Sequence, residues 1–138
     1  MASFNKFNAF VEAVAEEKHN FESDQLAVAL CAAANAPAAA NSVLTDLTEI
    51  SYTNCSSRVV TTDSYSQTGG TAKLVCSDLT LTASGGTVGP LRYVVLYNET
   101  APSDELVGYW DYGSDITLQD GEQLSIDFDD SNGVLQIA

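Results

Sequence analysis

The sequence predicts a mainly β protein, an antiparallel β-sandwich of about eight strands with a short amino-terminal helix or arm. Strand-length apolar or alternating runs recur about every ten to twelve residues through residues 58–138, which is typical of a sandwich or barrel. Each run stops at a cluster of Gly, Pro, Asn or Asp, the residues that favour turns. With 138 residues, 45% of them hydrophobic, the chain is long enough for one domain with its own core. A jelly roll is one of the topologies that fit. We therefore divide the predicted domain, residues 1–138, into a helix or arm (1–22), an Ala-rich connecting loop (32–48) and a sandwich body (50–138).

The amino-terminal segment has helical periodicity. Phe4, Phe7, Val11 and Val14 recur at three- and four-residue steps, which predicts an amphipathic helix of about twelve to sixteen residues. It should end near His19, whose side chain would then cap the last carbonyl groups of the helix. The aromatic stripe could either pack into the core or dock on a neighbouring subunit.

The next segment joins this helix to the sandwich body. Residues 26–31 (LAVALC) form a short apolar run that we interpret as the first buried strand. Residues 32–42 are rich in Ala and contain Pro37, which prevents a continuous helix. This segment is either a plain connector or an extended arm on a partner's surface, and residues 43–49 could form one helical turn.

The remaining strands follow from β-branched and aromatic runs between turns. Asn132 and Gly133 lie between Phe128 and Val134, a pattern that predicts a two-residue β-hairpin. We expect turns at residues 67–70 and 84–86. The predicted strands are residues 58–65, 71–76, 79–83, 93–97, 106–112 and 124–128, with a last strand after Gly133.

The net charge of −14 is the outstanding compositional feature. A surface this acidic repels phosphate groups, so we expect no direct binding to nucleic acid. The same charge favours solubility or a complementary basic partner. No apolar stretch is long enough to span a membrane, and no signal peptide is apparent, so we expect synthesis in a reducing cytoplasm. Cys31, Cys55 and Cys76 are too far apart in the sequence for a zinc motif and are expected to be free thiols.

The chain offers little for catalysis or metal binding. Residues 127–133 resemble a calcium loop, but the required glycine position holds Asn132 and the twelfth position holds Ala138, so a turn explains them better. A second acidic group could form a glycosidase pair, but its members fall where turns need Asp. His19 is the only histidine, and no nucleophile motif accompanies it. We therefore expect no enzyme activity, no cofactor and no metal. The second acidic group consists of Asp111, Asp115, Asp120 and Glu122.

Aromatic residues gather in two neighbouring predicted strands. Such residues serve as core, as interface anchors or as a platform for sugar rings, and all three alternatives remain open here. Arg92, one of two arginines, could pair with Glu99 or Asp111, or bind a partner's carboxylate. The aromatic group consists of Tyr93, Tyr97, Tyr109, Trp110 and Tyr112.

Several phrases of the sequence resemble small virion proteins of tailed bacteriophages. They are residues 89–98 (GPLRYVVLYN), 106–113 (LVGYWDYG), 46–50 (DLTEI) and the amino-terminal FNKF, with FVE at residues 10–12 and HN at 19–20. The resemblance covers nearly the whole chain but includes no catalytic motif. It implies a capsid cement or decoration protein, made in the host bacterium and located on the capsid surface of the virion. Its partner would be the major capsid protein, and self-association into dimers or trimers is expected because capsid symmetry axes favour it.

Two other functions remain alternatives: a phage neck or tail component, and a carbohydrate-binding module. If the protein is a cement protein, aromatic residues of the arm and of the sheet, with one arginine, would supply the contacts. The predicted contact residues are Phe4, Phe7, Phe10, Arg92, Tyr109 and Trp110.

Overall fold

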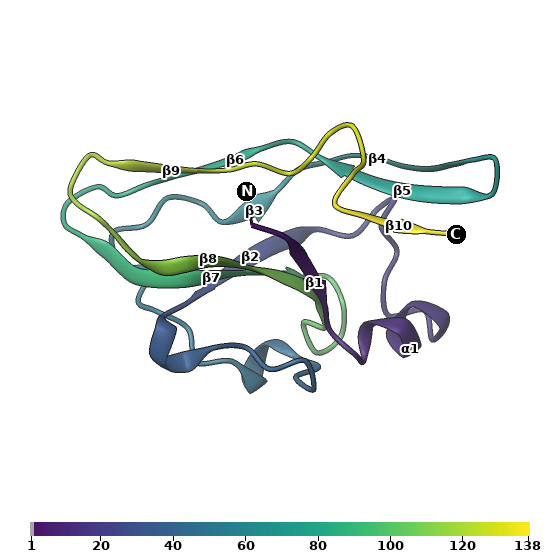
Figure 1. The fold of residues 1–138 in the computed structure, drawn as a ribbon, viewed down its shortest axis with the longest axis horizontal. Coiled ribbons are helices and arrows are strands. Elements are labelled where there is room, and N and C mark those ends of the chain that lie inside the picture. The colour runs from purple at the N-terminus through teal and green to yellow at the C-terminus, as the bar shows by residue number, and fades with distance from the viewer. Residues whose placement is uncertain (1) are drawn as a thin grey trace.

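The computed structural model describes residues 2–138, and in it two layers of antiparallel β-structure face each other (Figure 1). The lower layer in Figure 1 is a five-stranded sheet with the order β1-β8-β7-β2-β3. The upper layer holds a three-stranded sheet, β10-β5-β4, and a two-stranded sheet, β6-β9. The prediction of a mainly β, sandwich-like fold is thus confirmed, with about ten strands. Their bounds are β1 Phe4–Lys6, β2 Leu26–Cys31, β3 Val59–Val60, β4 Thr62–Thr68, β5 Thr71–Cys76, β6 Leu79–Thr82, β7 Val88–Asn98, β8 Leu106–Leu118, β9 Gln123–Ile126 and β10 Leu135–Ile137.

The lower sheet is covered on both faces, which explains why β2 is apolar at every position. Leu26, Val28 and Leu30 belong to the core between the two layers. Ala27 and Cys31 alternate with them and pack in a second apolar cluster on the opposite face. A strand buried on both faces has no polar position, so the prediction of a buried strand at these residues is confirmed.

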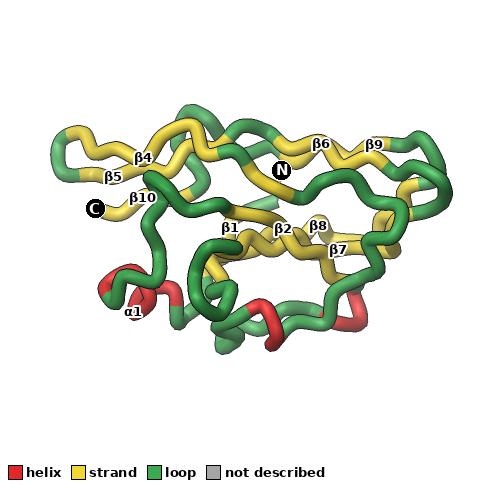
Figure 2. The backbone as a smooth tube through the Cα atoms, turned by 180° about the vertical axis from the view of Figure 1, so that it is seen from behind, coloured by secondary structure: helices red, strands yellow, loops and turns green. Residues whose placement is uncertain are grey.

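The Ala-rich segment covers the second face of the lower sheet. It runs below that sheet in Figures 1 and 2 and contains two 3₁₀ turns, η1 Ala33–Asn35 and η2 Leu44–Asp46. Leu44 and Leu47 pack against the second apolar cluster. The predicted helical turn within residues 43–49 is therefore confirmed. The segment is more than a connector, because it shields one face of the sheet from water.

The prediction of a long amino-terminal helix is wrong. Phe4–Lys6 is the edge strand β1, which pairs antiparallel with β8, and the helix α1 spans only Phe10–Ala15. The three-residue spacing of Phe4 and Phe7 fitted a helix, but here Phe4 packs on Trp110 and Phe7 on Tyr109. Tertiary packing has overridden a local periodicity.

Gly108 makes the pairing of β1 with β8 possible. A Cβ at this position would overlap the Phe4 ring and lie 2.8 Å from the Asn5 carbonyl oxygen. We expect Gly108→Ala to destabilise the fold by about 1–3 kcal/mol, as overpacking of this kind does, and to release β1. Hydrogen exchange at residues 4–6 and urea unfolding measure both effects.

A double-mutant cycle supplies the control for Gly108. In a Phe4→Ala background the ring is gone, so Gly108→Ala should cost clearly less than it does in the wild type. An equal cost in both backgrounds would mean that the glycine is needed for another reason.

In the upper layer, the two strands that were predicted to form a hairpin with each other pair instead with β6 and β5. β9 pairs with β6 and β10 pairs with β5, so the chain after Gln123 runs antiparallel to residues 72–82. Asn132 and Gly133 lie in a loop between two strands that do not pair with each other, and the hairpin prediction is wrong. Gly133 has a φ of 77°, and a Cβ there would lie 2.6 Å from the Leu74 carbonyl oxygen. Glycine is needed here because the backbone passes close to β5, and not because it forms a hairpin turn.

The other strand predictions differ from the structure mainly at their ends. Residues 71–76 form β5 as predicted, and β4 joins it through the glycines 69 and 70, both with positive φ. Residues 58–65 are divided, because β3 belongs to the lower sheet and β4 to the upper one. β7 and β8 are longer than predicted, since β7 continues through Gly89 and Pro90 with shifts of register.

Candidate functional site

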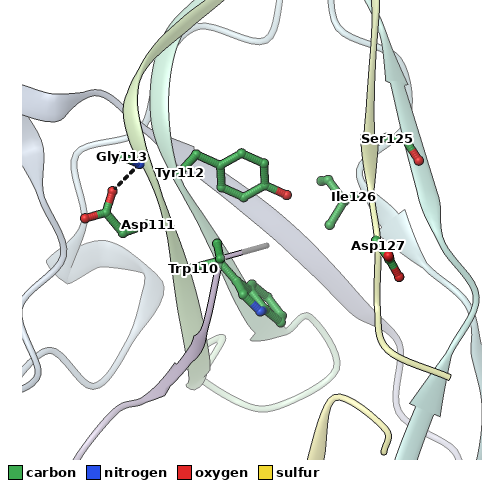
Figure 3. A pocket seen from close by; sticks show the side chains of 8 residues that line it. Trp110, Asp111, Tyr112, Gly113, Ser125, Ile126 and Asp127 are labelled. Atoms are coloured by element: carbon green, nitrogen blue, oxygen red, sulfur yellow. Dashed lines mark hydrogen bonds between the residues drawn. The ribbon is translucent and has the colours of Figure 1, made fainter. Parts of the chain in front are cut away.

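A groove opens between the two layers along one side of the sandwich. One hollow, of about 560 Å³, lies between residues 110–113 of β8 and residues 125–127 of β9 and the loop after it (Figure 3). A second hollow, of about 300 Å³, shares Ala2, Trp110 and Asp127 with the first and extends toward Val134. We call the two together the β8–β9 groove. Its size lies in the range of ligand-binding clefts in proteins.

Both walls of the groove are strand edges. β1 pairs with β8 only at residues 108–110, so among the described residues β8 has no strand on that side from Asp111 onward. β9 pairs with β6 and, within the same residues, has no strand on its other side. Edges of this kind can accept a further strand through backbone hydrogen bonds.

Several polar side-chain groups that line the groove have no hydrogen-bond partner within residues 2–138. They are the Tyr112 hydroxyl, the Trp110 indole N–H, the Asp127 carboxylate and the hydroxyls of Ser3 and Ser125, whereas Asp111 and Asp129 accept hydrogen bonds from other groups. Figure 3 shows the Tyr112 ring extending from β8 toward Ile126 on the facing strand. Burial, together with the charge of Asp127, raises the pKa of Tyr112, so this phenol is a neutral donor at physiological pH.

Asp111 is the first residue of β8 beyond its pairing with β1, and its carboxylate occupies a backbone N–H group there. Its carboxylate accepts hydrogen bonds from Arg92 at 2.8 and 3.1 Å and from the Gly113 N–H at 2.8 Å. These bonds lower the pKa of Asp111. The predicted pairing of Arg92 with Asp111 is therefore found, and it leaves Arg92 partly committed within its own chain.

The other acids of the suspected glycosidase group hold backbone amides in separate places. Asp115 accepts from the Ala33 N–H, Asp120 from the Gly85 N–H and Glu122 from the Gln119 N–H. Asp120 and Glu122 lie at the turn between β8 and β9, as is usual for acids in turns, whereas Asp115 lies within β8. Each of the four carboxylates therefore already has a hydrogen-bond partner within the chain.

The calcium-like residues form a turn held by one side chain. The Asp129 carboxylate accepts from the backbone N–H groups of Ser131 and Asn132 and from the Asn132 amide, each at 2.9 Å. These bonds lower the pKa of Asp129. Within residues 2–138 no group of three or more His, Cys, Asp or Glu side chains could hold a metal ion.

Half of the predicted contact residues are largely buried. Phe7 and Phe10 are 0% and 5% exposed, whereas Trp110 is 8% exposed and meets the β8–β9 groove with a small part of its surface. Trp110 lies between Phe4 and Phe128, at 5.2 and 5.6 Å between ring centres, which also leaves no open face for a sugar ring. Phe4, Arg92 and Tyr109 keep part of their surface, and their role in binding stays a prediction.

Sequence reasoning named Tyr112 and Asp127 but did not bring them together. Tyr112 is two positions from Trp110 on one strand, and Asp127 is two positions from Ser125 on another. Because side chains alternate along a strand, the two residues of each pair lie on the same face of their strand. What the sequence lacked was the long-range pairing that sets β8 opposite β9.

A buried polar network at one end of the sandwich was also missed. Asn98 is fully buried, and its amide nitrogen donates to Asp24 at 2.7 Å and lies 3.1 Å from His19 Nδ1. The His19 ring stacks on Phe21 at 5.4 Å and lies 5.3 Å from Phe10. The prediction that His19 caps the helix is wrong, because α1 ends at Ala15 and His19 belongs to this network.

His19 should make stability depend on pH. Burial lowers the pKa of His19 below its ordinary value of 6.5, despite the opposing charges of Glu105 and Asp24. The unfolded chain therefore binds a proton at a higher pH than the folded one, and stability falls as the pH falls through about 6.5. We expect the urea midpoint to decrease between about pH 7.5 and about pH 5.5, and to decrease less in His19→Gln. Equal decreases in both proteins would exclude His19 as the cause.

The three cysteines are free, as predicted. Cys31 and Cys76 are buried, and burial raises the pKa of each thiol to about 11. Cys55 is partly buried, and its pKa is raised for the same reason. The thiolate form that reacts or binds metal is therefore disfavoured at all three.

No protein-family model matches the chain, and neither the curated proteins nor the solved structures include a chain significantly similar to it. None of the helices in residues 2–138 has the length and apolar character needed to cross a bilayer.

Proposed function

We propose that this protein is a non-enzymatic structural component of a tailed-phage head, a cement or decoration protein that binds the lattice of the major capsid protein. The observation that carries a binding role is the β8–β9 groove, where two strand edges border a hollow lined by polar groups without a hydrogen-bond partner in residues 2–138. The phage assignment comes from the sequence resemblance in residues 46–50, 89–98 and 106–113 and at the amino end.

The charge of the chain defines the chemistry of the partner surface. With 19 acidic and 5 basic residues, copies of this protein repel one another and are attracted to a basic surface. A capsid lattice offers many equivalent sites, and a protein that bridges two subunits gains from a high effective concentration once one end is bound. Many modest contacts then stabilise the head together. Dimers or trimers at symmetry axes are part of this proposal, with the lattice rather than the free protein bringing the copies together.

Reconstitution tests the proposal. Heads assembled without this protein are mixed with the purified protein, and the bound amount and the temperature of DNA release are measured. We expect saturable binding and a higher release temperature. Absence of binding, with heads that still bind protein from a wild-type lysate, would contradict the proposal.

The salt dependence of binding is a further prediction. Because attraction between exposed charges is screened by salt, the affinity for heads should decrease as NaCl is raised from about 0.05 to about 0.5 M. Equilibrium sedimentation with heads measures the bound fraction. An affinity that does not change with salt would mean that apolar contacts, and not the acidic surface, hold the protein on the head.

A further inference from the structure

We infer that the β8–β9 groove binds an extended segment of the capsid protein that carries a Lys or Arg next to an apolar residue. This inference rests on the proposed function and adds the place and the chemistry of the contact. Three features of the groove support it, namely its walls, its floor and its charge. The overall charge of the chain supports it as well.

The walls favour an extended segment. β8 is paired with β1 only as far as Trp110, and beyond that residue its backbone N–H and C=O groups on this side have no partner strand. The outer side of β9 has no partner strand either. An extended peptide is the occupant that can satisfy such groups in a row. Asp111 already holds the Gly113 N–H, so the open part of β8 is short, and side-chain contacts must supply much of the affinity.

The floor favours an apolar side chain beside polar backbone. Trp110, Tyr112 and Ile126 line the first hollow, and Phe4, Phe128 and Val134 line the second. The indole N–H of Trp110 and the hydroxyl of Tyr112 can donate to the carbonyl groups of an occupant.

The charge of the lining favours a basic side chain. Asp111, Asp127 and Asp129 line the two hollows, and no Lys or Arg does so within the described residues. Arg92 neutralises Asp111, and the turn amides engage Asp129. The exposed Asp127 carboxylate is therefore the one left to pair with a Lys or Arg from outside.

A second copy of this chain fits the groove poorly. The chain has 5 basic residues against 19 acidic ones, so bringing two copies together at an acidic groove meets like-charge repulsion. A basic segment of a different protein has no such penalty.

Matched charge reversals test the inference. Asp127→Lys reverses the free carboxylate of the groove, and Asp130→Lys makes the same change at an exposed position nearby that does not line the groove. We expect Asp127→Lys to weaken binding to heads by about tenfold or more and Asp130→Lys to change it by less than about threefold. Circular dichroism and urea unfolding of both variants establish that each is folded. Equal binding by the two variants would overturn the inference.

A peptide probe separates this inference from the proposed function. A hexapeptide of alternating Lys and Val is titrated into the ¹⁵N-labelled protein, with the Glu and Val counterpart as control. We expect amide shifts at residues 110–113 and 124–127 for the Lys peptide alone, lost in Asp127→Lys. Shifts elsewhere, or equal shifts with both peptides, would overturn the groove assignment.

Failure of the wild type to bind heads would overturn the proposed function, and the peptide result would then decide by itself whether the groove binds a basic segment. A dimer that Asp127→Lys abolishes, seen by sedimentation, would identify a second copy as the occupant and overturn the inference.

Discussion

Replacing Asn98 with alanine should lower the free energy of unfolding by about 3–5 kcal/mol, because four hydrogen bonds meet at this buried side chain. Its oxygen accepts from the N–H groups of Thr100 and Ala101, each at 3.0 Å. Its nitrogen contacts the Asp24 carboxylate and the His19 ring. Alanine would remove all four contacts, and the buried Ala101 N–H would lose its acceptor while Asp24 would keep only its bond from the Asn20 N–H. Urea unfolding measures the change.

Two comparisons test the Asn98 result. Asn132→Ala removes an exposed amide that donates to Asp129, and it should cost less than about 1 kcal/mol. Asn98→Asp keeps the acceptor for both N–H groups but sets a second carboxylate beside Asp24, so its stability should improve as the pH falls toward about 4. If Asn98→Ala cost no more than Asn132→Ala, the network would not be an essential part of the fold.

Replacing Trp110 with alanine should cost about 3–5 kcal/mol, the range for large aromatic side chains in a core. The ring is 8% exposed and packs between Phe4 of β1 and Phe128 of the loop after β9. Its loss would leave a cavity between the two layers and loosen the edge strand. A domain of this kind has about 5–15 kcal/mol of stability in total, so the variant should be only marginally folded.

A surface truncation supplies the comparison for Trp110. Val11 is 60% exposed on α1, so Val11→Ala should change stability by less than about 0.5 kcal/mol. The same experiment addresses the carbohydrate alternative. Unchanged stability of Trp110→Ala, together with loss of glycan binding, would contradict a core role and favour a sugar-binding platform.

The fold class could be predicted because its evidence is local. The continuous apolar run of β2, the glycine turn between β4 and β5, and the alternation in β9 each follow from a few neighbouring residues. The interpretation of acids as turn residues was right for Asp120 and Asp129, which lie in turns, but wrong for Asp111 and Asp115, which lie within β8.

The errors concern residues whose structure depends on distant partners. Phe4 has a helical spacing to its neighbours, but its position is set by Gly108 and Trp110 across the sheet. Asn132 and Gly133 have the local pattern of a hairpin, but β10 pairs with β5 rather than with β9. No local rule contains such pairings, and the groove that they create could not be predicted from the sequence.

The copy number of the protein in purified virions tests the central claim most directly. Quantitative mass spectrometry, with the major capsid protein as internal standard, measures it. A cement role predicts hundreds of copies per particle, equal to the capsid protein or a simple fraction of it. A count of about six to twelve, the order of a symmetric ring, would instead assign the protein to the neck or tail. Absence from the particle would contradict a virion role altogether.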